Sequence, residues 1–385
     1  MPGTGRTYYV AGAGIAGLTL ALALAKFGAK VVVLERNPAI SEFGAGLQVS
    51  PNARKILDNL GLNEALSAHS LEPAGIDVYP FRRAVPLVTM ELGAIMRQRF
   101  GAPYAVMHRA DLADLLYRAC RRFANIDILF GVHDWDVVSQ AGGVTVTYKA
   151  DGQSRTGRGD AFIGADGVHS PTRRTLLGGP EAQYGGRTAW RGLMQATAVE
   201  GKLPLDRVSV FLSPDRHVVT YPLPHRGQVN VAMFAPEADT APPPLKHWPH
   251  LAAILEAVED WTPWSLYTVD ASRWHSGNIG LVGDAAHAMV PFQAQGAAMG
   301  IEDAAVLAPL LIAESNAETA FGKYSQARRS RVARVARISA TNGRIFHMRW
   351  PLNLARDAVI SLQGSRGHLR RLAWLYGHES LFQAD

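Results

Sequence analysis

A glycine-rich turn near the start of the chain constrains the fold most strongly. It follows a short apolar run, Thr7 to Val10, and precedes a helix-forming stretch. Gly12 permits a tight strand-to-helix turn, Gly14 lets the backbone approach a pyrophosphate, and Gly17 lets the helix pack close to the strand. The free N–H groups and the positive dipole end of such a helix favour an anion. The turn therefore predicts a dinucleotide-binding site, without choosing between NAD and FAD.

The residues after the turn complete a β-α-β unit. The helix-forming stretch Leu18 to Phe27 stops at Gly28, a natural C-cap, and Lys30 to Leu34 is hydrophobic enough for a buried parallel strand. Glu35 lies just past the carboxyl end of this strand, where it can accept hydrogen bonds from an adenosine ribose. Arg36 beside it is a second cofactor-binding candidate.

A second motif, near residue 280, favours FAD. Here we predict a strand that ends in a turn carrying the carboxylate of Asp284. A helix is then expected to begin at Gly296 and to continue through Ala297 and Ala298. Asp284 can accept a hydrogen bond from a ribityl hydroxyl, although an aspartate at such a place is also a common helix cap. The N–H groups at the helix start can stabilise the anion that develops on a reduced flavin ring.

The middle of the chain changes character. From about Arg187 to Phe234, apolar and polar residues alternate between prolines and glycines, which is typical of an antiparallel sheet. A strand-then-helix pattern returns at Asn278 to Val282, and the chain is mostly helical after Ser330. We therefore predict an α/β fold: a discontinuous, Rossmann-like FAD-binding domain with an inserted antiparallel-sheet substrate domain and C-terminal helices. The expected boundaries are 1–75, 101–180 and 272–335 for the FAD-binding domain, 76–100 and 181–271 for the substrate domain, and 336–385 for the C-terminal helical segment.

Composition argues against several other classes. The single cysteine, Cys120, rules out an intramolecular disulfide and a thiolate metal cluster, and it fits a reducing cytoplasm. We predict no metal site. The formal charge of +6 could suggest nucleic acid, but the basic residues are spread along the chain and their densest cluster, Arg328 to Arg344, resembles a solvated helix face. We therefore expect no nucleic-acid partner, and no apolar run is long enough to predict a transmembrane segment.

Three ordered motifs resemble those of one enzyme family. The stretch Gly164 to Arg173, which contains Asp166, resembles the Asp-Gly motif of single-component, class A flavoprotein aromatic hydroxylases. The glycine turn and the stretch around Asp284 resemble the two other FAD-binding motifs of that family. Arg109 matches an arginine that contacts the flavin and its phosphates in the family. The resemblance spans roughly residues 6 to 345.

Two segments are similar to a narrower branch, that of salicylate hydroxylase, 6-hydroxynicotinate monooxygenase and 3-hydroxybenzoate 6-hydroxylase. Ala294 stands where many family members have glycine, and Gly44 to Asn52 also resembles this branch. In the family this second segment passes near the flavin ring. The resemblance therefore makes Gln48 and Val49 candidates for contact with the ring.

The resemblance implies an NAD(P)H- and FAD-dependent monooxygenase that hydroxylates a phenolic or N-heteroaromatic acid. FAD would bind non-covalently, NADH or NADPH would reduce it, and O₂ would form a C4a-hydroperoxyflavin that transfers its distal oxygen to the ring. The sequence holds no second glycine fingerprint, so the nicotinamide cofactor is expected to bind transiently without its own domain. A small aromatic substrate is the expected partner, and the sequence leaves a homodimer open.

The expected substrate strand is Arg216 to Leu223. Its period-two alternation puts His217, Val219 and Tyr221 on one face. A polar group there can orient or deprotonate a ring hydroxyl, because a phenolate reacts faster with an electrophilic oxygen, so His217 and Tyr221 are the catalytic candidates. The alternative is a histidine satisfied within the sheet and a tyrosine packed beside it.

Three further side chains are weaker candidates. His287 follows the flavin motif and either lines the same cavity or belongs to the turn itself. Arg191 and Arg83 are candidate carboxylate clamps, since a guanidinium suits a bidentate carboxylate.

Three other functions remain compatible with the motifs. The first is a hydroxylase of a quinone or other lipophilic precursor, with the basic C-terminal helices on a membrane surface. The second is a flavin oxidase or dehydrogenase without oxygen insertion. The third is a non-catalytic FAD-binding protein.

Overall fold

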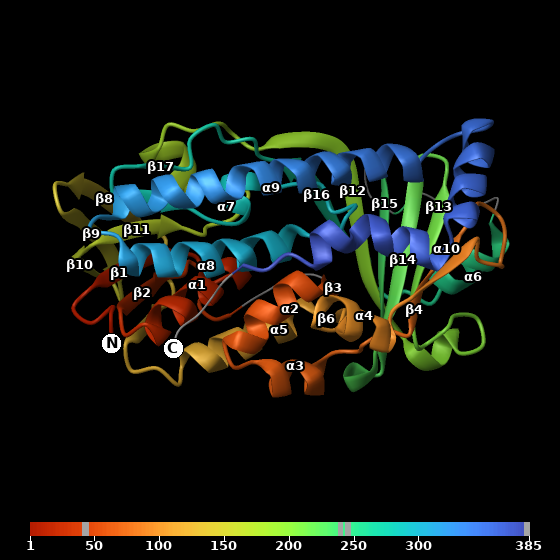
Figure 1. The fold of residues 1–385 in the computed structure, drawn as a ribbon, viewed down its shortest axis with the longest axis horizontal. Coiled ribbons are helices and arrows are strands. Elements are labelled where there is room, and N and C mark those ends of the chain that lie inside the picture. The colour runs from red at the N-terminus through yellow and green to blue at the C-terminus, as the bar shows by residue number, and fades with distance from the viewer. Residues whose placement is uncertain (41–45, 238–241, 243–247, 381–385) are drawn as a thin grey trace.

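Two large sheets lie toward opposite ends of an elongated molecule, and the long helix α9 (Ala317–Phe346) runs along it (Figure 1). The structure is a computed structural model that describes residues 1–40, 46–237, 242 and 248–380. The first sheet is mostly parallel and covered by helices, the second is mostly antiparallel, and helices close the chain. This arrangement confirms the predicted fold class.

The first sheet carries the glycine turn. Its six strands lie in the order β17-β18-β11-β1-β2-β7, and all pairs are parallel except β17 with β18. The strands are β17 (His275–Ser276), β18 (Ile279–Leu281), β11 (Ala161–Gly164), β1 (Thr7–Ala11), β2 (Lys30–Leu34) and β7 (Ile126–Leu129). The chain continues from β1 to β2 on one side and later returns to β11 on the other. The carboxyl end of β1 is therefore a topological switch point, where open α/β sheets bind ligands.

Close packing explains the glycines of the turn. Helix α1 (Ile15–Lys26) is buried almost throughout, against α8 (Gly296–Ala313) and α5 (Arg109–Cys120). A Cβ at Gly17 would collide with the carbonyl oxygen of Gly12, so only glycine lets the helix start this close to β1. Gly12 itself has φ +102, a conformation that L side chains rarely adopt.

The second sheet has seven strands in the order β16-β12-β15-β14-β13-β4-β5. They are β16 (Thr262–Thr268), β12 (Gln183–Gln195), β15 (Gln228–Pro236), β14 (Arg216–Leu223), β13 (Val208–Ser213), β4 (Gly75–Tyr79) and β5 (Val88–Glu91). The alternating residues of the middle region form strands as predicted. One pair differs: β13 and β4 are parallel, because β4 belongs to an earlier part of the chain that joins the edge of the sheet.

Smaller elements connect and cover the sheets. The strands are β3 (Gly46–Val49) paired with β6 (Ala105–His108), and a meander of β8 (Trp135–Gln140), β9 (Gly143–Ala150) and β10 (Gln153–Gly159). The helices are α2 (Pro51–Asn59), α3 (Asn63–His69), α4 (Gly93–Phe100), α6 (Pro249–Leu255), α7 (Asp284–His287) and α10 (Leu352–Tyr376), which is broken at Gly364.

Helix α8 is the one described helix that is long and apolar enough to cross a membrane. Most of its residues are buried against α1, α2 and α9. Its apolar composition is therefore that of a core helix. Cys120 is buried at the end of α5, as its place in the apolar rhythm predicts.

Candidate active site

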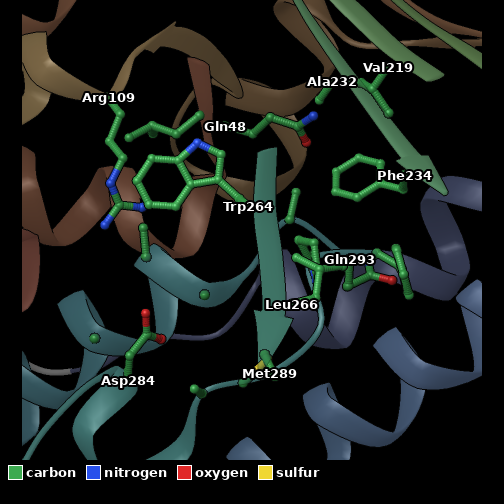
Figure 2. Close-up of a pocket in the computed structure, with 18 of the residues that line it drawn as sticks. Gln48, Arg109, Val219, Ala232, Phe234, Trp264, Leu266, Asp284, Met289 and Gln293 are labelled. Atoms are coloured by element: carbon green, nitrogen blue, oxygen red, sulfur yellow. The ribbon is translucent and has the colours of Figure 1, made fainter. Parts of the chain in front are cut away.

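A cavity of about 1710 Å³ connects the glycine turn with the face of the second sheet. Figure 2 shows Arg109 and Asp284 on one side of this space and Val219 and Phe234 on the other. Pockets for single small ligands measure roughly 300–1,000 Å³. The cavity therefore has room for an extended cofactor and a second, smaller ligand.

The N-terminus of α1 opens onto this cavity. Gly12 and Gly14 line it, Gly14 is the N-cap without a side-chain hydrogen bond, and the first turn holds no acidic residue. The first N–H groups of a helix without a capping side chain need another acceptor. An anion such as a pyrophosphate matches both this need and the helix dipole.

Glu35 holds the turn and also lines the cavity. Its Oε2 accepts a hydrogen bond from Ala13 N at 2.7 Å, and its Oε1 accepts one from Asn37 N at 2.9 Å. Each carboxylate oxygen keeps capacity for a second donor. Arg36 is exposed at the same end of the cavity.

Asp166 lines the cavity and has one buried oxygen without a partner among the described residues. Its Oδ2 accepts from the N–H and hydroxyl of Thr172, at 2.9 and 2.6 Å, whereas Oδ1 is buried and has no partner among the described residues. Burial raises the pKa of Asp166, and the hydrogen bonds from Thr172 oppose that rise. A buried acceptor without a partner is rare in a folded protein. A hydrogen-bond donor on a bound ligand would satisfy it.

A buried ionic cluster supports the turn that carries Asp284. Oδ2 of Asp303 accepts from Gly283 N at 2.9 Å and from His287 Nε2 at 2.6 Å, and its Oδ1 accepts from Arg328 Nε at 2.8 Å. Burial alone would raise the pKa of Asp303, but His287 and Arg328 hold it well below its usual value. His287 thus belongs to the turn and does not line the cavity. Asp284, the residue after Gly283, is exposed toward the cavity (Figure 2).

The residues expected around a flavin ring divide into two groups. Gln48, Gly296 and Ala297 line the cavity, and so does Arg109, whose side chain points toward the ring of Trp264 in Figure 2. The side chains of Val49 and Ala298 are buried behind the cavity wall and do not line it. Both are the next residue along a strand or helix from a lining residue, and therefore point elsewhere. Of the segment Gly44 to Asn52, Gly44 and Ala45 lie outside the described residues.

Ala294 adopts an unusual backbone conformation. Its φ is +53, in the left-handed region that glycine populates most easily. The position at which many family members carry glycine therefore keeps the glycine-like conformation in this chain.

Three rows of side chains on the second sheet form the far wall of the cavity. In the middle row Val219 of β14 lies in register with Ala232 of β15 and Val210 of β13, and Arg191 of β12 pairs with Ala232 on the other side. Registered neighbours point to the same face of a sheet, and all four residues line the cavity. The centre of this wall is therefore apolar, with a guanidinium at one edge.

The two outer rows carry the polar groups. His217 pairs with Phe234 in one row, and Tyr221 pairs with Asn230 in the other. His217, Val219 and Tyr221 all line the cavity, so the predicted alternation of β14 is confirmed. The two polar groups are four residue steps apart along the strand, which corresponds to roughly 13 Å between their Cα atoms. They lie at opposite ends of the apolar row.

Burial keeps both polar groups uncharged. Burial, His347 and Arg187 hold the pKa of His217 well below its usual 6.5. Burial raises the pKa of the Tyr221 hydroxyl above 10.0, although Arg191 opposes this rise. A neutral imidazole can accept a proton, and a neutral phenol can donate a hydrogen bond.

Only one of the two arginines predicted to bind a carboxylate lies at the cavity, and the cavity also contains residues that the sequence analysis missed. Arg191 lines the cavity, whereas Arg83 is exposed and does not. Asn230 and Phe234 were missed, although the alternation of β15 would have placed them on one face with Ala232. Trp264 also lines the cavity, from the edge strand β16.

No group of three or more His, Cys, Asp or Glu residues in the described part of the chain could hold a metal ion.

Comparison with known proteins identifies the class. A family model described as an FAD binding domain matches residues 7–339. The chain is 34% identical to 3-amino-4-hydroxybenzoate 2-monooxygenase PtnB3 of Streptomyces platensis, over 96% of each chain. It is 31% identical to 3-hydroxybenzoate 6-hydroxylase of Polaromonas naphthalenivorans, over 96% of this chain and 95% of that one. The structure of Klebsiella pneumoniae HpxO with FAD and uric acid matches with a TM-score of 0.82 and 25% identity, over 96% of each chain.

The chain therefore belongs to the family of FAD-dependent aromatic monooxygenases. FAD is its cofactor, and NAD(P)H and O₂ are the co-substrates of this class. The residues present fit FAD: the uncapped N-terminus of α1 suits its pyrophosphate, and Oδ1 of Asp166 awaits a donor beside the same cavity.

Proposed function

We propose that this chain hydroxylates a small phenolic or N-heteroaromatic acid at the ring. The observation that carries the proposal is the apolar row of β13, β14 and β15, which lies between His217 at one end and Tyr221 at the other. The relatives act, by their names, on hydroxybenzoates, and HpxO was crystallised with uric acid, a nitrogen heterocycle.

The cofactor would span the first part of the cavity. Its adenosine and pyrophosphate would contact the turn of Gly12 and Gly14, which Gly17 allows to pack close to the helix. The ribose would bind Glu35, and Arg36 would lie beside the ribose. Arg109, Asp166 and Asp284 would hold the ribityl and phosphate groups, and the ring would lie between Gln48 and the helix start at Gly296 and Ala297. The domain boundaries given above follow the same division, with the substrate on the second sheet.

The substrate would lie over Val219 and Ala232. A monocyclic aromatic acid is shorter than the distance along the strand between His217 and Tyr221, so it fits between their side chains. Each end of the molecule would then face a different polar group. We assign the ring hydroxyl to His217 and the carboxylate to the end with Tyr221, because the charge of Arg191, in the middle row, acts on the Tyr221 hydroxyl.

Bound FAD would supply the activation of O₂, and the chain would supply the placement and the proton chemistry. His217 would accept the hydroxyl proton, which makes the ring more electron-rich. The buried, apolar wall would exclude water from the reacting atoms. NADH or NADPH would bind transiently at the same cavity. The single cysteine, buried Cys120, supports a cytoplasmic location.

A screen of aromatic acids tests this function. NADH and NADPH oxidation would be followed with each compound, and mass spectrometry would identify products. We expect one group of hydroxyaromatic acids to stimulate oxidation and to gain one oxygen atom. Release of hydrogen peroxide alone, with every compound unchanged, would instead establish an oxidase.

A further inference from the structure

A second histidine lies behind His217. Nδ1 of His217 is 2.8 Å from Nε2 of His347, the residue that follows α9. The two side chains come from distant parts of the chain, and both are buried. A hydrogen bond between two neutral imidazoles requires that one nitrogen carries the proton and the other accepts it. The pair therefore determines which nitrogen of His217 is left for the cavity.

Aromatic rings enclose this pair. Phe234 stacks on His217 with the ring centroids 4.6 Å apart, while the edges of Phe292 and Phe346 approach at 5.3 and 5.2 Å between centroids. Such walls solvate an imidazolium poorly. Burial lowers the pKa of His217 well below 6.5 and that of His347 to about 4, so both rings are neutral near neutral pH.

Three charged groups act on the pair. Arg187 of β12 acts on both histidines, whereas Asp215, between β13 and β14, and Arg356 of α10 act on His347. The carboxylate of Asp215 is 38% exposed. His347 thus lies between the buried His217 and a charged turn that reaches solvent. Among these groups only Asp215 favours a proton on His347, and its carboxylate also pairs with Arg349 at 2.7 Å. A neutral His347 whose Nε2 accepts from His217 carries its proton on the far nitrogen, Nδ1.

We propose that His347 sets the tautomer of His217 and passes the proton of a bound ring hydroxyl toward solvent. The proposal rests on the function proposed above. Nδ1–H of His217 donates to Nε2 of His347, which leaves Nε2 of His217 as a bare acceptor for the cavity. No hydrogen bond among the described residues uses this Nε2.

The proton moves in three coupled transfers. The substrate hydroxyl gives its proton to Nε2 of His217, the Nδ1 proton of His217 moves to Nε2 of His347, and Nδ1 of His347 releases its proton to water beside Asp215. The sum is a phenolate in the cavity and one proton in solvent. Neither imidazole retains a charge, which suits a site that disfavours the cation.

Nitrogen NMR of histidine-labelled holoenzyme tests the tautomer. The His217 signals would be assigned by their loss in His217→Asn. We expect Nδ1 of His217 to carry the proton in the wild type and in His347→Gln, whose amide oxygen still accepts. In His347→Phe the proton should move to Nε2. A wild-type His217 that is already protonated at Nε2 would overturn the proposal.

A pH jump tests the transfer itself. 4-Nitrophenol bound to oxidised holoenzyme would be followed by stopped-flow absorbance as it ionises. We expect His347→Gln to slow ionisation on the order of tenfold or more, because glutamine accepts a hydrogen bond and passes no proton. The exposed His250→Gln on α6 should behave as wild type. Equal rates in wild type and His347→Gln would overturn the relay.

The two proposals fail separately. A wild type that hydroxylates no aromatic acid would remove the proposed function while the NMR result still tests the histidine pair. A wild type that hydroxylates, with the opposite tautomer at His217, would remove the relay alone.

Discussion

Oδ1 of Asn230 accepts a hydrogen bond from the backbone N–H of Gly46 at 2.6 Å. Asn230 belongs to β15 of the second sheet, and Gly46 begins β3, two residues before Gln48. The ring of Tyr221 lies against the same glycine, where any Cβ would collide with it. These contacts join the strands proposed to hold the substrate to the segment proposed to lie at the flavin.

Asn230→Ala should weaken this junction. The half-buried N–H of Gly46 would lose its acceptor, which costs about 0.5–1.5 kcal/mol in the free energy of unfolding. We expect KM for the aromatic acid to rise and kcat to fall while FAD remains bound. Asn125→Ala is the matched control, because it removes hydrogen bonds to Ala25 O and Ala29 O far from the cavity. It should lower stability, measured by urea unfolding, without changing KM.

Tyr221→Phe should slow hydroxylation and leave the FAD content unchanged. The change removes only the buried hydroxyl at the end of the apolar row, so we expect roughly a tenfold loss of kcat/KM, about 1.4 kcal/mol. Tyr79→Phe is the control, since Tyr79 is a buried tyrosine that stacks on Phe211 and does not line the cavity. Unchanged activity in Tyr221→Phe would mean that the proposed substrate strand is wrong.

The sequence predicted those features that local periodicity or glycine chemistry determines. The turn at Gly12 and Gly17 requires glycine because the helix starts against the strand, and this requirement is visible in the sequence. The shared face of His217 and Tyr221 follows from a period of two. The same period of two applies to β15, so the position of Asn230 on the cavity face could also have been predicted from the sequence.

Other features depend on distant packing, and the local sequence does not encode them. His347 follows a long helix, and nothing near it indicates that it meets His217, 130 residues away. The parallel pairing of β13 with β4 likewise depends on which edge remains free after the sheet assembles. His287 is held in the turn by the buried carboxylate of Asp303 on the following helix, and the local sequence does not show this contact.

Gly12→Ala should abolish FAD binding. Position 12 has φ +102, and a Cβ there would lie 2.5 Å from the carbonyl oxygen of Ala165, so the turn and the neighbouring loop must separate. Gly5→Ala is the matched control, because Gly5 has φ +89 and open space around its Cβ. It shares the backbone strain without the collision. FAD content of the purified proteins, compared with their circular dichroism, separates loss of the site from loss of the fold.

Arg328→Met should destabilise the protein strongly. It would leave Asp303 buried with only His287 beside it and Glu302 with only Arg331, which costs about 3 kcal/mol in the free energy of unfolding. Lys323→Met removes a cation from the same helix, but its pair with Glu314 is exposed and should cost less than about 1 kcal/mol. Similar urea midpoints for the two variants would contradict the importance assigned to the buried cluster.

The histidine pair should make stability depend on pH in a defined window. Above pH 6.5 both histidines are neutral in the folded and unfolded states, so their contribution to stability is fully present. As the pH falls below 6.5, the histidines of the unfolded chain bind protons while those of the folded protein remain neutral. Stability is therefore lost progressively until the pH reaches about 4, the pKa of His347 in the folded protein. The span from 6.5 to about 4 corresponds to about 3 kcal/mol for this residue. Urea unfolding at a series of pH values should therefore give a flatter profile for His347→Phe than for the wild type, whereas His250→Gln should keep the wild-type slope. Parallel profiles for His347→Phe and the wild type would show that His347 has the same pKa in the folded and unfolded states, which contradicts the lowered pKa of the buried pair.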